Sequence, residues 1–176
     1  MNFYCPTLVS GSDRYLAWEP FMHEALVCAR TAQEQGDVPV GAVVVNECGR
    51  VLGRGENRTI LSNDPTAHAE ILAIRAACST EGNYRLAGAV LVVTLEPCIM
   101  CLGAIIQARL AGVVFATPDP KAGSLISRMA GSEIPWSNHH FWMAQGVLAD
   151  TCSTLLREFF QRRRHEKKIF KNLAER

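Results

Sequence analysis

The sequence predicts an α/β domain in which a mixed, five-stranded sheet is covered by helices on both faces. In the second half of the chain, short apolar strands alternate with helical segments, a pattern typical of crossover units around one sheet. One of these strands, Ala89–Leu95, is an apolar run, which predicts that both of its faces are buried. A chain of 176 residues is the size of a single domain.

The individual helices and strands are predicted from the spacing of apolar residues and from the turn residues between them. Apolar residues recur at helical spacing over residues 18–35 and stop before Gly36, which predicts the first helix. Val40–Val45 and Val51–Gly55 flank a turn sequence and predict a hairpin. The next four elements are a helix over Thr66–Cys78, a strand over Ala89–Leu95, a helix over Pro97–Arg109 and a strand over Ala111–Thr117.

The last third of the chain is less regular. Pro, Gly and Ser punctuate Pro118–Gln145, where we expect a short helix near Leu125–Met129 and a strand near His140–Gln145. Leu148–Leu173 predicts a long C-terminal helix with an apolar stripe and a basic end. We expect residues 1–17 to form a flexible arm and residues 18–176 to form one domain.

Composition narrows the classes of function. The net charge is +1, so nothing in the overall charge points to nucleic acid, and any such signal must be local. No apolar stretch has the length of a membrane helix, and the N-terminus does not read as a secretory signal. Seven cysteines, an odd number without a signal peptide, argue against a disulfide scaffold and favour a cytoplasmic protein.

Two short motifs contain the residues that suggest chemistry. Cys98 and Cys101 are three apart, which places both thiols on one face of a helix, after a proline that suits a helix start. His68 offers a nitrogen ligand from the start of another helix. One His and two Cys suit zinc, and three protein ligands leave a coordination position for water, as in catalytic zinc sites. Glu70 is then placed to carry the proton of that water.

The spacing of His68 and Glu70 needs an explanation. Side chains two residues apart on a regular helix point away from each other. We expect both to lie at the mouth of the helix, where side chains lean over its end and approach one ion from different sides. The hypothesis fails if His68 and Glu70 face opposite surfaces.

Other interpretations of these motifs stay open at this point. A Cys-x-x-Cys pair also occurs as a redox couple or as half of a structural zinc site. His139 or His140 would close the site if either supplied a fourth ligand. The protein would then be a non-catalytic zinc module that binds RNA or a protein partner.

His-x-Glu followed by Pro-Cys-x-x-Cys resembles the signature of the zinc-dependent cytidine and deoxycytidylate deaminase superfamily. Within it, the chain is most similar to the branch that acts on adenosine in tRNA, through stretches such as DVPVGAVVV, NDPTAHAEI and TLEPCIMCLGAI. The resemblance implies the three-layer α/β/α cytidine-deaminase-like fold. It also implies one Zn²⁺ per chain, bound by His68, Cys98 and Cys101, with Glu70 as the catalytic proton carrier.

The resemblance further implies hydrolytic deamination of adenosine to inosine at the anticodon wobble position of tRNA. Asn57 matches the side chain that hydrogen-bonds the base, the backbone of Val38 and Ala69 matches groups that orient it, and Asp119 matches a contact to a neighbouring ribose. The simpler alternatives are a turn residue for Asn57 and a loop carboxylate for Asp119.

The end of the C-terminal helix offers candidate contacts to the RNA backbone, namely Arg162, Arg163, Arg164 and Lys167. The alternative is a solvated helix end, where cations are favourable in any case. The resemblance implies a homodimer. Pro118 stands where the family pattern has a basic residue, and the loop after Asp119 departs from that pattern. The alternative function is therefore deamination of a free base or nucleoside, of the guanine or cytosine type.

Overall fold

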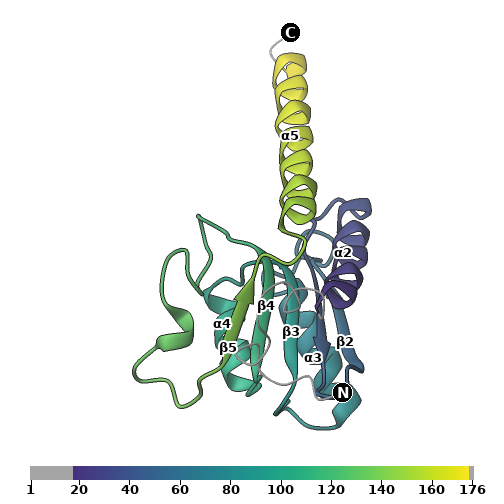
Figure 1. Cartoon of the computed structure of the whole chain (residues 1–176). Coiled ribbons are helices and arrows are strands. Elements are labelled where there is room, and N and C mark those ends of the chain that lie inside the picture. The colour runs from purple at the N-terminus through teal and green to yellow at the C-terminus, as the bar shows by residue number, and fades with distance from the viewer. Residues whose placement is uncertain (1–17, 175–176) are drawn as a thin grey trace.

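The computed structural model describes residues 18–174, with side chains to residue 170. The predicted flexible arm, residues 1–17, lies outside the described residues. The predicted five-stranded mixed sheet is confirmed, with strand order β2-β1-β3-β4-β5 (Figure 1). The strands are β1 (Gly41–Val45), β2 (Val51–Glu56), β3 (Val90–Leu95), β4 (Gly112–Thr117) and β5 (Trp142–Gln145).

Strand direction determines which chain segments meet. β1 runs antiparallel to both β2 and β3, whereas β3, β4 and β5 are parallel. β2, β3, β4 and β5 therefore run in the same direction, and their carboxyl ends lie on the side of the sheet where β1 begins. Ligands in open α/β sheets bind outside the carboxyl ends of the strands. The segments that follow β2, β3 and β4, and the segment before β1, are thus the ones available to build a site.

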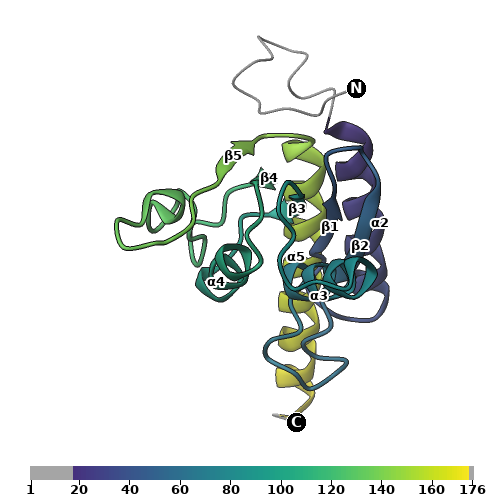
Figure 2. The same ribbon diagram turned by 90° about the horizontal axis from the view of Figure 1, so that it is seen from below.

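Helices cover both faces of the sheet, as predicted (Figure 2). α3 (Ala69–Glu81) and α4 (Ile99–Gln107) pack on one face, and α2 (Glu19–Glu34) and α5 (Ala149–Ala174) pack on the other. Alternate side chains of each central strand enter opposite cores, because successive residues of a strand point to opposite faces. Val44 and Leu91 lie in the α3/α4 core, and Val43 and Val92 lie in the α2/α5 core.

Glycines bring α3 close to β2. A Cβ on Gly55 would lie 2.2 Å from the carbonyl oxygen of Ala69, and one on Gly53 would lie 2.4 Å from that of Ala73. Only glycine permits a backbone approach of this kind. The start of α3 is therefore held beside the end of β2, where Asn57 follows.

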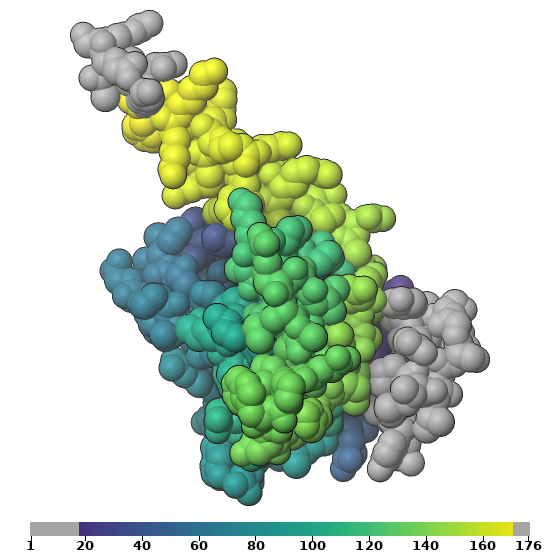
Figure 3. Space-filling model, turned by 90° about the vertical axis from the view of Figure 1, so that its left-hand side faces the viewer, coloured from purple at the N-terminus to yellow at the C-terminus, as the bar shows by residue number. Residues whose placement is uncertain are grey.

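α5 packs on the sheet only along its first half. Cys152, Leu155 and Phe159 are buried, whereas Phe160 is half-exposed and the residues from 161 to 165 are exposed. The rest of the helix projects from the body as a free rod (Figures 1 and 3). In the described part of the chain, no helix is both long and apolar enough to span a membrane.

Two expected helices are wrong in detail. Leu125–Met129 forms turns, and a short 3₁₀ segment lies later, at Gly131–Glu133. The N–H groups of Leu125, Ile126 and Ser127 all donate to the carboxylate of Glu96, which holds these turns in place.

α3 begins at Ala69 instead of Thr66. The backbone N–H and the hydroxyl of Thr66 both donate to Asp64, at 2.7 Å each. Such a local side-chain turn competes with helix formation.

Candidate active site

A cavity of about 510 Å³ lies at the sheet edge where four strands end, within the ~300–1,000 Å³ usual for ligand sites. Its walls come from the segments that the topology brings together. The lining residues are Val38, Val40, Asn57, Thr59, His68, Glu70, Leu95, Glu96, Cys98, Pro118, Asp119, Pro120, Lys121, Ala122, Leu156 and Phe160.

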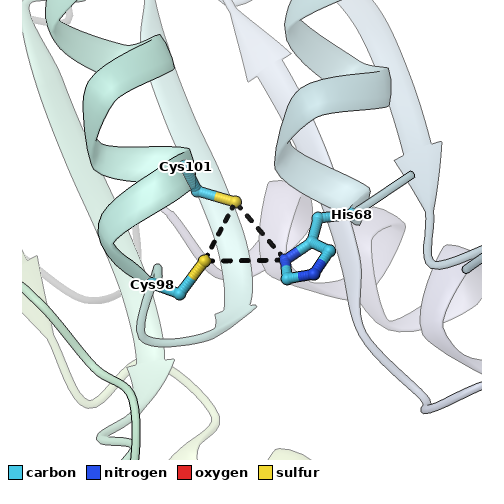
Figure 4. Close-up of side chains that lie close together, drawn as sticks. All are labelled: His68, Cys98 and Cys101. Atoms are coloured by element: carbon cyan, nitrogen blue, oxygen red, sulfur yellow. Dashed lines mark hydrogen bonds between the residues drawn. The ribbon is translucent and has the colours of Figure 1, made fainter. Parts of the chain in front are cut away.

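The three predicted metal ligands meet at this cavity (Figure 4). The two sulfurs of Cys98 and Cys101 are 3.7 Å apart, and His68 Nδ1 lies 3.7 Å and 3.6 Å from them. Two of these residues are the N-caps of their helices, His68 for α3 and Cys98 for α4, and both have extended backbones. Neither makes the side-chain hydrogen bond common at an N-cap, so each side chain is free to point at the other helix.

The dimensions of this triangle fit zinc. Bond lengths of about 2.3 Å to sulfur and about 2.0–2.1 Å to nitrogen give tetrahedral edges of about 3.8 Å between two sulfurs and about 3.6 Å between sulfur and nitrogen. The observed separations of 3.7, 3.7 and 3.6 Å are within a tenth of an ångström of these edges. One His and two Cys are also a known donor set for zinc with an open position.

The two thiols differ in acidity. The hydrogen bond between them, together with His68, lowers the pKa of Cys98 to about 3, so this sulfur is a thiolate at neutral pH. The same hydrogen bond and burial raise the pKa of Cys101 above its usual range. A metal ion needs both sulfurs as thiolates, so its binding here releases a proton.

His68 and Glu70 face the same cavity, so the geometric check on the sequence hypothesis is met. The structure explains this shared orientation more specifically than the sequence did. His68 lies outside the helix, and its extended backbone aims its ring independently of helical periodicity. Glu70 lies in the first turn of α3, where its own backbone N–H and the Cys101 thiol act on the pKa of its carboxyl. Burial raises the pKa of Glu70 above its ordinary value, which favours a group that takes up and returns a proton.

Asn57 links the cavity to α3. Its side-chain oxygen accepts the Ala69 N–H at 2.9 Å, so it satisfies a helix donor that the N-cap His68 leaves free. With Oδ1 engaged, the amide Nδ2 is the polar atom left to meet a ligand. Asn57 is therefore a structural residue and a candidate base contact together.

The other predicted substrate contacts are placed unequally. Val38 and Asp119 line the cavity. Ala69 is fully buried and is absent from the lining, and its N–H donates to Asn57 instead of facing a ligand. Val38 offers its carbonyl to Val40 N–H at 2.7 Å. The substrate roles of these residues remain predictions.

The two histidines proposed as a fourth ligand lie elsewhere. His139 Nε2 donates to the Leu110 carbonyl at 2.7 Å, and His140 Nδ1 lies 3.5 Å from the Ser132 carbonyl. The ligand cluster found among residues 18–170 contains only His68, Cys98 and Cys101. The closed, four-ligand alternative therefore has no support in the described part of the chain.

Two buried carboxylates were missed by the sequence analysis. Asp37 accepts from Thr59 Oγ1 and from the N–H groups of Ile60 and Leu61. Glu96 accepts from one side-chain and four backbone donors of the loop after β4. Burial alone would raise the pKa of Glu96, yet hydrogen bonds led by those from Ile126 and Ser127 outweigh it and lower the pKa. A single acidic residue beside a strand carries no sequence signal for this role.

The predicted RNA-backbone residues do not belong to the cavity. Arg162, Arg163, Arg164 and Lys167 lie on the exposed projecting part of α5. Arg163 approaches Glu166 at 3.4 Å, an exposed ion pair of small energetic weight. The connection to the cavity is Phe160, one turn earlier, which lines it and packs edge-on against Phe159 at 5.4 Å.

Known proteins share this architecture. Residues 17–117 match the family model described as the cytidine and deoxycytidylate deaminase zinc-binding region. A tRNA-specific adenosine deaminase of Haemophilus influenzae is 46% identical over 155 residues, which cover 88% of this chain and 90% of the relative. A structure from a study of A-to-I editing by tRNA:A34 deaminases has a TM-score of 0.75 and 44% identity, covering 78% of this chain and 99% of that one.

A guanine deaminase of Bacillus subtilis is a more distant neighbour, with a TM-score of 0.56 and 34% identity over 84% of this chain and 93% of its own. The fold, the match over the two motifs and the identity over most of both chains agree. This chain belongs to the cytidine and deoxycytidylate deaminase family of zinc-binding enzymes, and its relatives place it among the tRNA-specific adenosine deaminases.

Proposed function

We propose that this protein catalyses zinc-dependent hydrolytic deamination of adenosine to inosine at the anticodon wobble position of tRNA. The observation that carries the proposal is the arrangement of His68, Cys98 and Cys101 in a zinc-sized triangle with Glu70 in the same cavity. The reaction consumes one water and releases one ammonia, and an adenine amino group becomes a keto group.

His68, Cys98 and Cys101 would hold the metal. Zinc held there would supply a water of lowered pKa, about 7, as a nucleophile at neutral pH. Glu70 would take one proton of this water and deliver it to the ring nitrogen. It would then move the second proton, from the oxygen added to the ring, to the departing amine as the keto group forms. Its buried position and raised pKa suit a group that is protonated and deprotonated in one turnover.

The remaining lining residues would position the base. Asn57 Nδ2 donates to an acceptor on the adenine edge, while Val38, Val40 and Leu95 provide an apolar surface against the ring. Asp119 lines the cavity, and we propose that it meets a ribose hydroxyl of a neighbouring nucleotide. A flipped or unpaired nucleotide enters such a pocket, because a stacked base is out of reach of the metal.

The rest of the tRNA loop would lie outside the cavity. The projecting basic face of α5, with Arg162, Arg163, Arg164 and Lys167, is proposed to contact phosphates. The resemblance to the family also supports a homodimer. The six cysteines among the described residues are all free thiols, which supports a reducing, cytoplasmic setting.

A second candidate is deamination of a free base. The observation that favours it is the 34% identity to a guanine deaminase structure, together with the Pro118 and 118–142 loop departures noted above. The basic α5 argues for the tRNA substrate, because a free base needs no such extension.

The test is ammonia release from four substrates: an anticodon stem-loop with a wobble adenosine, free adenosine, free guanine and free cytosine. We expect kcat/KM to be highest for the stem-loop. A preference for free guanine would support the second candidate instead, and no turnover by a zinc-loaded protein on any of the four would contradict both.

A further inference from the structure

Glu96 is a second carboxylate in the cavity wall, and its surroundings differ from those of Glu70. Its side chain is buried, with a residue exposure of 2%. Oε1 accepts the backbone N–H groups of Leu125, Ile126 and Ser127 at 3.0, 2.8 and 3.0 Å. Oε2 accepts the Asp119 N–H at 2.9 Å and the Ser127 hydroxyl.

These five donors use the whole capacity of the carboxylate, which has about four lone-pair sites. Glu96 therefore has no site left to exchange a proton with a substrate. Although it lines the same cavity as Glu70, it serves as an anchor for the loop and not as a proton carrier.

The anchored donors lie at the two ends of one segment. Asp119 is at the start of the loop, and Leu125, Ile126 and Ser127 are at its end. The first four residues of this segment, Asp119–Ala122, line the cavity as its outer wall. The hydrogen bonds of this stretch are local, from Gly123 N–H to the Asp119 carbonyl and from Lys121 N–H to the Asp119 side chain. Contacts of this kind shape the loop but do not fix its distance from the metal ligands.

The two residues after Glu96 join the wall to Cys98, a proposed metal ligand. Glu96 precedes Pro97, whose carbonyl accepts the N–H and hydroxyl of Ser124 at 2.9 and 3.1 Å. Cys98 forms an isolated bridge with Gly123. A Cβ on Gly123 would lie 2.2 Å from Glu96 Oε2 and 2.7 Å from the Asp119 carbonyl, so the loop sits directly on the carboxylate.

We propose that Glu96 is a positioning residue that fixes the Asp119–Ala122 wall relative to the metal ligands and so sets substrate affinity. Its effect on the metal and on the proton carrier is small, because its five hydrogen bonds all come from the 119–127 loop. The inference rests on the proposed function for the identity of the substrate.

The sharpest probe is Glu96→Gln. Glutamine keeps one acceptor oxygen, which the three N–H groups of Leu125, Ile126 and Ser127 claim. Its NH₂ then faces the Asp119 N–H, so two donors oppose each other and the start of the wall is released. The Ser127 hydroxyl can rotate to accept, so the conflict is confined to Asp119.

The measurement is steady-state kinetics of the zinc-loaded full chain, with zinc content determined in parallel. For the substrate that the wild type prefers, we expect KM to rise about tenfold or more, with kcat within about threefold and one zinc retained per chain. An unchanged KM overturns the proposal, as does a fall in kcat with KM constant.

Two further variants separate wall position from general stability. Gly123→Ala keeps the carboxylate but forces a methyl group against it, so we expect the same rise in KM with zinc retained. Ser127→Ala removes only one hydroxyl donor and leaves the Asp119 contact, so we expect a change in KM of less than about threefold. If both Glu96→Gln and Gly123→Ala lose zinc and the folded state, Glu96 supports the whole domain and the proposal is wrong.

The proposed function and this inference fail in distinguishable ways. The ranking of the four substrates by the wild type tests the function. The ratio of KM between Glu96→Gln and wild type tests the inference, on whichever substrate the wild type deaminates. A wild type that prefers free guanine would contradict the tRNA assignment, while the KM ratio for guanine would still decide the role of Glu96.

Discussion

The cavity has two loop walls, and each is held by a buried carboxylate in a different way. Asp37 precedes β1 and accepts Thr59 Oγ1 and the N–H groups of Ile60 and Leu61 at 2.8, 2.9 and 3.1 Å. Glu96 follows β3 and accepts five donors of the 119–127 loop. Both carboxylates bind backbone N–H groups, a strong interaction because the acceptor is charged.

The walls differ in what else holds them. The Asp37 wall lies between Asn57 and the proposed metal ligand His68 in sequence. Asn57 Oδ1 accepts the Ala69 N–H, and the Arg58 N–H donates to the Ala67 carbonyl. This wall is therefore built into the start of α3. The Glu96 wall is 23 to 31 residues from its anchor. The second wall is joined to the proposed ligand Cys98 through Ser124 on Pro97 and through the Cys98–Gly123 bridge, and not through the start of α3.

The largest effect should come from changing one of the three proposed metal ligands. In Cys98→Ser, a hydroxyl replaces a thiolate ligand. Changes to groups that only orient a ligand already cost about 10–100-fold in metal affinity, so we expect more than a 100-fold loss here and no measurable turnover. Zinc titration against a competing chelator checks this. A variant that binds zinc as wild type does would remove Cys98 from the site.

Glu70→Gln should affect the chemical step without affecting the two loop walls of the cavity. We expect zinc content and substrate KM to stay near wild type, while kcat falls by about 10²–10⁴, the usual contribution of a general acid–base group. Single-turnover ammonia release measures the effect, and Glu34→Gln on the exposed end of α2 is the matched control. Turnover at the wild-type rate would contradict the role of Glu70.

Asp37→Asn compares the walls directly. The neutral amide oxygen accepts the Ile60 and Leu61 N–H groups less strongly than the carboxylate does, while its NH₂ can donate to the Thr59 hydroxyl, so we expect a loss of about 1–3 kcal/mol in the free energy of unfolding. Because this wall is joined to the start of α3, we also expect faster zinc loss to a chelator, unlike Glu96→Gln. Equal rates of zinc loss in Asp37→Asn and Glu96→Gln would contradict the proposed difference between the two walls. Denaturant melts and zinc release, measured side by side, decide this.

The smallest effect should come from α5, outside both walls. Arg164→Ala is expected to weaken stem-loop binding two- to fivefold at low salt and to reduce the salt slope by about 0.7–0.9, the contribution of one phosphate contact. Arg50→Ala, which removes an exposed ion pair with Glu81, is the matched control. Binding with an unchanged salt slope would show that Arg164 is a solvated residue of the helix end.

The sequence anticipated most of the fold, because strands and helices with buried faces have periodic apolar patterns. Val90–Leu95 and Glu19–Glu34 lie within one residue of the predicted bounds at most ends. The loop from Pro118 to Phe141 was less accessible to prediction. Its N–H groups are satisfied by Glu96, a side chain more than twenty residues away, and no local pattern reveals such a partner.

The sequence by itself determined the donor set on which the proposed chemistry rests. His68, Cys98 and Cys101 define a donor set, and the ligand count points to zinc with an open position. Residue type alone carries this information, since ligand preference is a property of the side chain.

Only the tertiary structure decided how these groups meet. It placed His68 and Cys98 at extended N-cap positions, so that His68 and Glu70 share a cavity despite their spacing. In the structure, His139 and His140 lie away from the proposed metal ligands. Asp37 and Glu96 each accept hydrogen bonds from one loop wall of the cavity. The physical reason is that direction and partnership depend on strand order and on hydrogen bonds between distant segments, which a sequence of residue types does not encode locally.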